Sequence, residues 1–287
     1  MPILLTTLAM LAFAANSILC REALASGHIG ASAFTLLRIV SGAVVLSLLL
    51  FINNRCDKQR GQWKLDGSWI SAAALFAYAA GFSFAYLKLS TGTGALLLFG
   101  AVQITMIAFA LWKGERLTLL QLAGATLAAA GLVWLMLPSV ESPPLLAALI
   151  MVGAGIAWGV YSLLGRGAKN PTEVTAGNFI RAVPFAFILF FMLGQQEHTS
   201  AMGVMYAIAS GALASGLGYA LWYAVLPLLT ASTAATVQLS VPIIAALGGV
   251  VLLDEAMTLR FILASLAVLG GIALFVLNKR KTTMPSE

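Results

Sequence analysis

Charged residues are scarce in this sequence, and their distribution is as informative as their number. They make up 9% of the 287 residues, against 61% for hydrophobic residues, whereas a soluble domain carries about 25% charged residues. Between Arg181 and Asp254 the only charged residue is Glu197. Segments this apolar must face lipid or other apolar helices, which excludes a soluble globular protein.

Cysteine and histidine are also rare, which bears on metal binding and catalysis. The two cysteines, Cys20 and Cys56, fall on opposite sides of the expected membrane, so we predict neither a disulfide nor a metal site. Both histidines, His28 and His198, fall in connections, and no Asp or Glu lies in the middle of an apolar segment. A serine nucleophile would therefore lack a buried base. The sequence does not support an enzyme, and it indicates no cofactor.

Apolar segments of about 20 residues, which suffice to cross a ~30 Å hydrocarbon core, recur ten times. Only 14 residues separate Arg38 from Asn53, or about 21 Å of helix, so Arg38 must lie inside the second span. The same argument places Arg181 inside the seventh. The predicted spans are 3–23, 32–52, 68–88, 92–112, 117–137, 144–165, 173–194, 202–226, 230–253 and 258–278.

The charges of the connections predict the orientation. Eleven of the 16 Lys and Arg residues fall on the side of the N-terminus and three on the other side, and such an excess marks the cytoplasmic side. We therefore expect a multi-pass protein of the plasma (inner) membrane with both termini in the cytoplasm. Because the net charge of +6 comes from these short connections, it does not indicate nucleic-acid binding.

The two halves of the sequence resemble each other. Residues 114–118 (Gly-Glu-Arg-Leu-Thr) recur at 254–258 as Asp-Glu-Ala-Met-Thr, an offset of 140. Each unit holds five spans, and an odd number makes the second copy enter the membrane from the opposite side. We predict an all-α integral membrane protein whose ten transmembrane helices form two inverted five-helix repeats, approximately 1–140 and 141–287, in a single membrane domain. Inverted repeats are typical of secondary transporters; duplication without transport is the alternative.

Aromatic residues recur at helical spacing inside the spans, so that each pair lies on one helix face. Aromatic rings bind planar apolar ligands, and tyrosine adds a hydroxyl that can orient them. The alternative is that these rings fill the core or sit at the bilayer interface. For Tyr86 and Tyr223, which lie near span ends, we expect the bilayer interface. The pairs are Tyr78 with Phe82, Phe99 with Gln103, Trp158 with Tyr161, and Tyr219 with Tyr223.

Uncharged polar residues inside the spans cost free energy unless they form hydrogen bonds. Asn16 and Gln103 are predicted to bind substrate, because they share helix faces with other candidates, and Asn16 aligns with Tyr161 in the repeat. For Asn178 and Gln238, interhelical hydrogen bonding and substrate binding stay open.

Two intramembrane arginines, Arg38 and Arg181, complete the candidates. Either guanidinium could bind a substrate carboxylate through its fork of donors. Each also lies only some two turns from a span end, so it could extend to the membrane surface. We expect gate or membrane-boundary contacts for both.

A further set of motifs comprises Trp158-Gly159 followed by Arg166 in the sixth span, Pro242 in the ninth, and the paired Glu115 and Glu255 ahead of small-residue helices that end at Gly131 and Gly271. In their order and duplication these motifs resemble the drug/metabolite transporter superfamily, in particular its ten-helix EamA-like members. The chain is also similar to the aromatic amino acid exporters of that family. This resemblance covers almost the whole chain, and it implies export of aromatic amino acids and related compounds.

Together these features predict an exporter of small amphipathic metabolites, foremost aromatic or hydrophobic amino acids, that works by alternating access through a central cavity. Its partners are the substrate and the lipid bilayer, with no nucleic acid and no obligate protein partner evident. The alternatives are a phosphate-ester or nucleotide-sugar exchanger of the same architecture and, less favoured, a membrane enzyme. The predicted substrate-binding residues are Asn16, Tyr78, Phe82, Phe99, Gln103, Trp158, Tyr161 and Tyr219.

Overall fold

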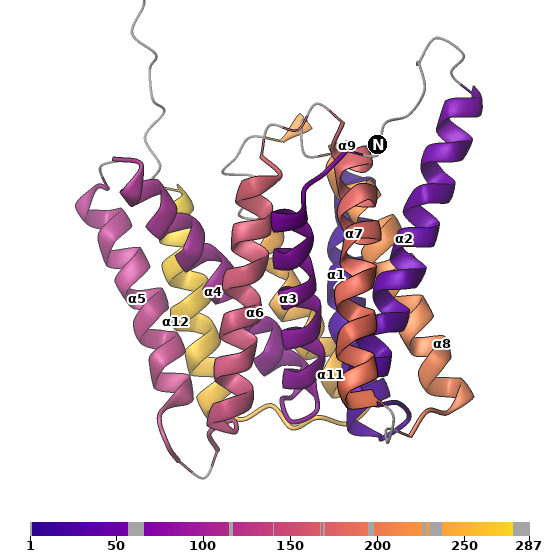
Figure 1. Ribbon diagram of the computed structural model, residues 1–287. Helices are drawn as coiled ribbons and strands as arrows, with labels where there is room; N and C mark the ends of the chain where they lie inside the picture. Colours follow the sequence, from indigo (N-terminus) through magenta and orange to yellow (C-terminus); the bar gives the residue numbers. More distant parts are fainter. Residues whose placement is uncertain are drawn as a thin grey trace, which may run out of the picture.

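The computed structural model describes residues 2–56, 66–114, 117–139, 141–166, 168, 170–194, 198–225, 228–229 and 237–277. Within these residues every named element is a helix (Figure 1), and the extended pairing is limited to an isolated bridge between Ile29 and Thr199. The elements are α1 (Pro2–Ala25), α2 (Ala31–Cys56), α3 (Trp69–Tyr86), α4 (Thr91–Trp112), α5 (Leu119–Met136), α6 (Leu145–Leu164), α7 (Pro171–Leu193), α8 (Ala201–Ala209), the π-helix η2 (Ser210–Leu217), α9 (Gly218–Val225), α11 (Ser240–Leu253) and α12 (Leu259–Leu277).

The predicted number of apolar helices is confirmed. In the described part of the chain nine helices are long and apolar enough to cross a membrane, with α8, η2 and α9 forming one segment, Ala201–Val225. Helix α11 is the tenth and has 14 residues, whereas the predicted span began at residue 230; residues 230–236 lie outside the described residues. Pro242 lies in the first turn of α11, where a missing N–H removes no helical hydrogen bond.

Polar side chains mark where several helices begin. The Ser68 hydroxyl accepts a hydrogen bond from the Ser71 N–H at the start of α3, and Ser200 does the same for Gly203 at the start of α8. At the start of α5, Thr118 and Gln121 form a reciprocal capping box. Because lipid offers no partners to free backbone groups, these caps let the helices begin close to the membrane surface.

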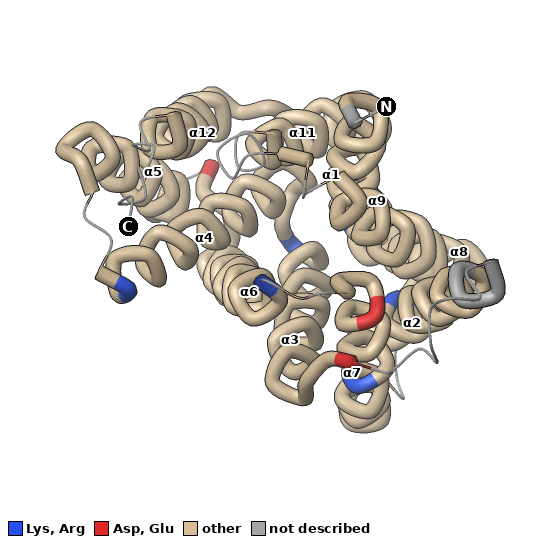
Figure 2. Tube along the Cα trace, turned by 90° about the horizontal axis from the view of Figure 1, so that it is seen from above, with Lys and Arg blue, Asp and Glu red and all other residues tan. Residues whose placement is uncertain are grey.

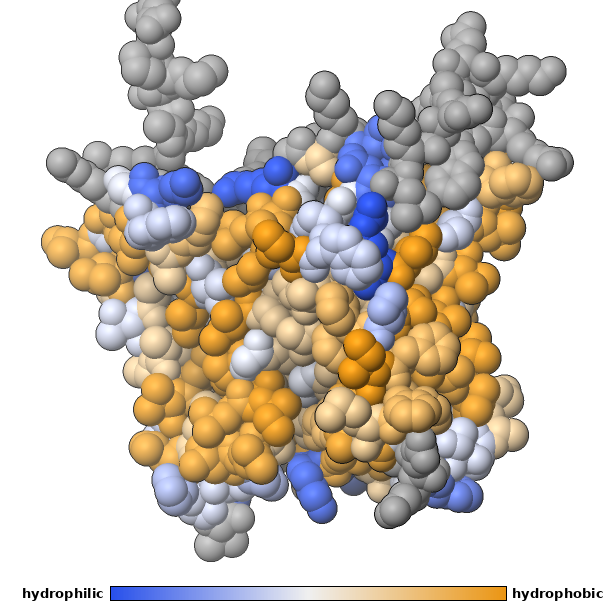
Figure 3. Space-filling view, in the orientation of Figure 1, coloured by the Kyte–Doolittle hydropathy of each residue, from blue (hydrophilic) through white to orange (hydrophobic). Residues whose placement is uncertain are grey.

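The surface matches a protein that spans a bilayer. Figure 3 shows hydrophobic side chains over the middle of the molecule, whereas hydrophilic residues gather at its upper and lower edges. Large apolar side chains project outward along the helices, among them Val133 on α5, Phe191 on α7 and Val251 on α11. Outward-facing apolar residues of this density need lipid as their solvent.

The two halves have opposite directions, as predicted. In Figure 1 successive helices alternate between the upper and lower edges, so that α1 runs downward and α6, the first helix of the second half, runs upward. Helix α1 begins and helix α12 ends at the upper edge. Most of the basic residues counted for the orientation, such as Lys58 and Lys279, lie outside the described residues, so the cytoplasmic assignment of this edge stays a prediction.

Equivalent helices of the two halves pack against each other. Helix α2 contacts α7, α4 contacts α11, and α5 contacts α12, while α3 packs on α6 and α1 packs on η2 and α9. Figure 2, which looks along the bundle, shows α5 and α12 side by side at one end and α8 at the other. This pattern is what a two-fold relation between the halves requires.

Helices α5 and α12 approach closely through glycine. A Cβ atom on Gly271 would lie 2.5 Å from the carbonyl oxygen of Gly124 and 2.7 Å from the backbone nitrogen of Ala128. Both contacts are to backbone, which cannot move aside without separating the helices. Small residues at such crossings are the usual basis of helix association in membranes.

We expect Gly271→Leu to destabilise the protein by about 1–3 kcal/mol, the usual range for overpacking. Gly270→Leu, one residue earlier on α12, is the matched control, because a Cβ there would meet no atom within 4 Å. Thermal unfolding in detergent would measure both. Equal midpoints for the two variants would show that the close approach contributes nothing to stability.

Candidate functional site

Five of the predicted site residues come together in one group of rings, which we call the aromatic cluster: Tyr78, Phe82, Trp158, Tyr161 and Tyr219. Trp158 lies in the middle, with its ring centroid 4.7 Å from Tyr78, 5.1 Å from Tyr219 and 5.4 Å from Tyr161. Tyr78 in turn lies 5.5 Å from Phe82. The rings are tilted against one another, an arrangement that aromatic pairs favour over face-to-face stacking.

Both halves of the chain build the aromatic cluster. Tyr78 and Phe82 are one turn apart on α3, in the first half, whereas Trp158 and Tyr161 share a face of α6 and Tyr219 lies on α9, in the second. Four of these side chains are buried and Trp158 is half-buried. A motion of one half relative to the other would therefore change the shape of this site.

Arg38 is in contact with the aromatic cluster. Its Nη2 donates to the Tyr78 hydroxyl at 2.8 Å, and its guanidinium carbon lies 5.1 Å from the centre of the Tyr78 ring and 4.8 Å from that of Phe82. The residue is only 2% exposed. The guanidinium therefore does not extend to either edge of the bundle, and the role of Arg38 as a gate or boundary residue stays a prediction.

The π-helical segment η2 connects Arg38 and Asn16 to the eighth predicted span. Ser215 accepts a hydrogen bond from Arg38 Nε at 3.3 Å, and Ser210 donates to the Asn16 side-chain oxygen at 2.6 Å. The two serines are five residues apart, which is the hydrogen-bond spacing of a π-helix. Periodicity alone predicted an ordinary helix here, whereas π-helical segments are rare and are often found at functional sites.

Three predicted site residues lie away from the aromatic cluster. Phe99 and Gln103 are buried on α4, and no hydrogen bond or ring contact between described residues joins them to it. Arg181, half-buried on α7, donates from Nη1 to the carbonyl oxygen of Asp66 at 2.7 Å and of Gly177 at 3.1 Å. The guanidinium of Arg181 thus contacts the end of the connection between α2 and α3.

Asn178, left open by the sequence, makes a structural contact. Its side-chain oxygen accepts a hydrogen bond from the Ser68 N–H at 3.0 Å, and it approaches Gly67 so closely that a Cβ there would lie 2.4 Å from it. Gly67 also has a φ of +101°, which glycine adopts most readily. Asn178 therefore anchors the connection before α3.

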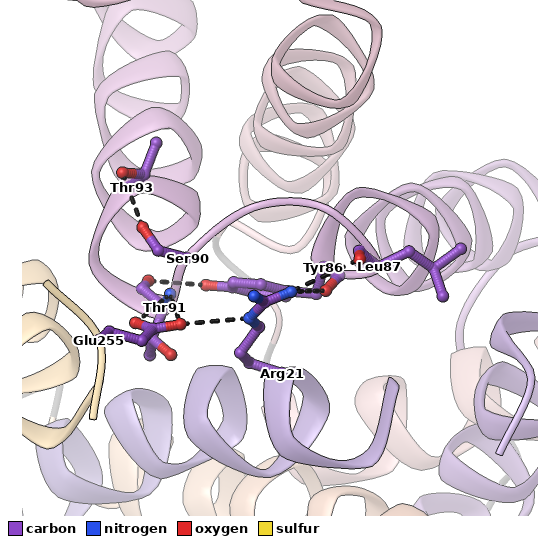
Figure 4. Close-up of polar contacts among 7 residues, drawn as sticks. All are labelled: Arg21, Tyr86, Leu87, Ser90, Thr91, Thr93 and Glu255. Carbon is purple, nitrogen blue, oxygen red and sulfur yellow. Dashed lines mark hydrogen bonds and ion pairs between the residues drawn. The ribbon is translucent and has the colours of Figure 1, made fainter. Parts of the chain in front are cut away.

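A second polar site, at the lower edge, was not predicted as a unit. We call it the Arg21–Glu255 junction, formed by Arg21, Tyr86, Thr91 and Glu255 (Figure 4). Arg21 Nε lies 3.1 Å from Glu255 Oε1, and the Thr91 N–H donates to both carboxylate oxygens, at 3.0 and 2.8 Å. Arg21 Nη1 donates to the Tyr86 carbonyl oxygen at 3.1 Å. The junction joins α1 and α4 to the connection between α11 and α12.

The expectation for Tyr86 was wrong. It is buried instead of lying in an interfacial belt, and its hydroxyl donates to the Thr91 carbonyl oxygen at 3.1 Å. Its ring lies 4.7 Å from Phe82, so it links the aromatic cluster to the Arg21–Glu255 junction. Its place near a helix end suggested the membrane interface, whereas the direction of its side chain depends on packing against α4, where Gly94 makes room for the ring.

A cavity of about 220 Å³ opens beside the junction. Its walls come from the α3–α4, α5–α6 and α11–α12 connections, and they include Lys88, Pro144 and Glu255 but no member of the aromatic cluster. The cavity is therefore a separate feature of the lower edge.

Comparison with known proteins agrees with this architecture. The EamA-like transporter family matches residues 1–137 and 145–277, each of which spans five of the apolar helices. The uncharacterized protein PA1977 of Pseudomonas aeruginosa is 53% identical over 274 residues, or 96% of this chain and 94% of that protein. The uncharacterized transporter YoaV of Bacillus subtilis is 24% identical over 264 residues, or 86% and 88% of the two chains.

Two further matches concern an exporter and a solved structure. The threonine/homoserine exporter RhtA of Escherichia coli is 30% identical over 162 residues, which cover 54% of this chain and 54% of the exporter. A crystal structure aligns over 98% of both chains with a TM-score of 0.67 at 20% identity, which shows a shared fold. With both halves matched by the family, the chain belongs to the EamA-like transporters of the drug/metabolite transporter superfamily and is an integral membrane transporter.

Proposed function

We propose that this transporter exports small amphipathic metabolites, foremost aromatic or bulky hydrophobic amino acids, from the cytoplasm. The observation that carries the proposal is the aromatic cluster, whose rings come from both halves and surround the half-buried Trp158. Aromatic surfaces of this kind bind planar apolar groups. The relationship to a threonine/homoserine exporter supports amino acids as the wider class.

Transport by alternating access is supported by contacts that hold the halves together at the lower edge. Besides the Arg21–Glu255 junction, the His28 carbonyl oxygen accepts hydrogen bonds from the Ser200 N–H at 2.8 Å and from its hydroxyl at 2.9 Å. Arg260 at the start of α12 donates to carbonyl oxygens at the end of α5. These contacts must break for the lower edge to open, so they favour a state that is closed there.

The alternatives have less support from the described residues. A phosphate-ester exchanger needs several cations around its site, and Arg38 is the cation that contacts the aromatic cluster. An enzyme needs an acid–base pair next to a nucleophile, and the polar groups bonded to Arg38 are hydroxyls, those of Tyr78 and Ser215. Transport without catalysis is therefore the function we propose, in the inner membrane with the upper edge cytoplasmic.

Purified protein in lipid vesicles would test this proposal. With labelled tryptophan, phenylalanine, threonine and glucose phosphate, we expect saturable flux of the aromatic amino acids and none of the phosphorylated sugar, because the described residues of the site offer rings and a single cation, Arg38. Empty vesicles supply the leak rate. Flux of the sugar phosphate without flux of tryptophan or phenylalanine would support the exchanger instead, and absence of flux for every solute would refute the proposal.

A further inference from the structure

Arg38 carries an unsatisfied buried charge. Nη2 donates a hydrogen bond to the Tyr78 hydroxyl and Nε donates one to the Ser215 hydroxyl. The third guanidinium nitrogen, Nη1, is buried without a hydrogen-bond partner among the described residues. An arginine stays protonated in proteins, so it cannot lower this cost by losing its proton. A buried donor on a charged group costs more than a neutral one when it is left unpaired.

The described chain supplies no carboxylate to neutralise Arg38. Its acidic residues lie in connections or within four residues of a helix end, at or near the edges of the bundle. Of the acidic side chains that the structure describes, Glu255 is in an ion pair, and its partner is Arg21 at the lower edge. A buried cation with hydroxyl partners alone is costly, and that cost falls when an anion arrives. The acidic residues that the structure describes, all at or near the edges of the bundle, are Glu22, Asp66, Glu141, Glu173, Asp254 and Glu255.

The surroundings of Arg38 specify what kind of anion fits. The rings of Tyr78 and Phe82 lie about the guanidinium at 5.1 and 4.8 Å, and Trp158 lies 4.7 Å beyond Tyr78. An anion bonded to Nη1 is therefore next to the aromatic cluster. A carboxylate matches the planar guanidinium fork, and an attached aromatic or bulky apolar group would contact the rings.

We propose that Arg38 binds the carboxylate of the transported solute, and that the substrate class is aromatic and bulky apolar carboxylates, whether or not they carry an ammonium group. The inference rests on the proposed function and deepens it. The solute must then carry a carboxylate, which pairs with Arg38. Its ammonium group is dispensable, because no carboxylate among the described residues faces the aromatic cluster to pair with it. The η2 segment supports the role, because Ser215 holds the guanidinium in place from the other half of the chain.

A series of phenyl compounds that carry a carboxylate, an ammonium group, both or neither tests the inference on the unmodified protein. Phenylalanine, hydrocinnamate, phenethylamine and phenethyl alcohol would be compared by the shift in thermal midpoint that each produces in detergent. We expect hydrocinnamate to bind as well as phenylalanine, and phenethylamine to bind about tenfold to a hundredfold more weakly, the range of a charged hydrogen bond. Equal binding of phenethylamine and phenylalanine, or no binding of hydrocinnamate, would overturn the inference.

Variants of Arg38 provide a second test. Arg38→Gln should weaken hydrocinnamate about tenfold or more while leaving the neutral phenethyl alcohol unchanged, and Arg38→Lys should restore part of the difference because it keeps the charge without the fork. Loss of both ligands together would show that Arg38 only maintains the site. Vesicle flux separates the two proposals: flux of phenethylamine without hydrocinnamate overturns this inference alone, whereas no flux of any solute overturns the proposed function.

Discussion

Replacing Trp158 with alanine is expected to lower the flux of tryptophan and phenylalanine at least about tenfold. Trp158 contacts three other rings of the aromatic cluster, at 4.7, 5.1 and 5.4 Å. An aromatic pair contributes about 0.5–1.5 kcal/mol beyond the area that it buries, and about 1.4 kcal/mol corresponds to a tenfold change in affinity. Removal of the central ring therefore removes the largest stacking surface of the site.

Two further variants make this prediction specific. Trp112→Ala removes the same side chain at the end of α4, where the residue is 78% exposed, and it should leave flux unchanged. Trp158→Phe keeps an aromatic face and should retain part of the activity. Flux from vesicles carrying equal amounts of folded protein measures all three. If Trp158→Ala and Trp112→Ala transported at the same rate, Trp158 would not belong to the substrate site.

Replacing Glu255 with alanine is expected to open the lower edge of the bundle. The change leaves Arg21 without its ion-pair partner and the Thr91 N–H without its acceptor. Hydrogen bonds to charged groups contribute about 1.5–3 kcal/mol each, so we expect the closed state to lose at least about tenfold in population relative to the open state. Free Cys20, buried and adjacent to Arg21, is a natural reporter of this opening.

The measurement is the rate at which Cys20 reacts with a membrane-impermeant maleimide in a Cys56→Ser background. That rate should rise about tenfold in Glu255→Ala, in proportion to the open population. Glu141→Ala is the control, since Glu141 lies at the same edge and has no ion pair among the described residues. An unchanged rate in Glu255→Ala would show that the junction does not hold this edge closed.

The helices and their inverted arrangement could be predicted because the membrane imposes simple requirements on the sequence. Lipid tolerates few charges and demands spans of about 20 residues, so the rare charged residues mark the helix ends. The odd number of spans in each repeat then determines the opposite directions. For the ninth predicted span, 230–253, only the later part can be compared, since residues 230–236 lie outside the described residues; there α11 ends at Leu253, where the span was predicted to end.

The residues of the aromatic cluster could also be predicted in part. Spacing of three or four residues identified the helix faces that carry Tyr78 and Trp158, but it could not show which faces meet. The same reasoning placed Phe99 with the others, and no ring contact between described residues joins it to them. Spacing reports the geometry of one helix, whereas a site depends on the packing of several.

The Arg21–Glu255 junction was beyond the reach of the sequence. Its two charged residues lie 234 positions apart, and no local pattern connects them. The sequence showed Glu255 only as part of a motif ahead of a small-residue helix, whereas in the structure it contacts the start of another helix, α4. The sequence provided no sign that this helix belongs to the other half of the chain.

A structure determined with phenylalanine or hydrocinnamate bound is the most direct test of the central claim, that the transported solute binds among the rings contributed by both halves. We expect density for the phenyl group against the rings of Tyr78 and Trp158, with the carboxylate within hydrogen-bonding distance of Arg38 Nη1. Density confined to the cavity beside Lys88 and Pro144 at the lower edge would contradict it, because that cavity contains none of these rings.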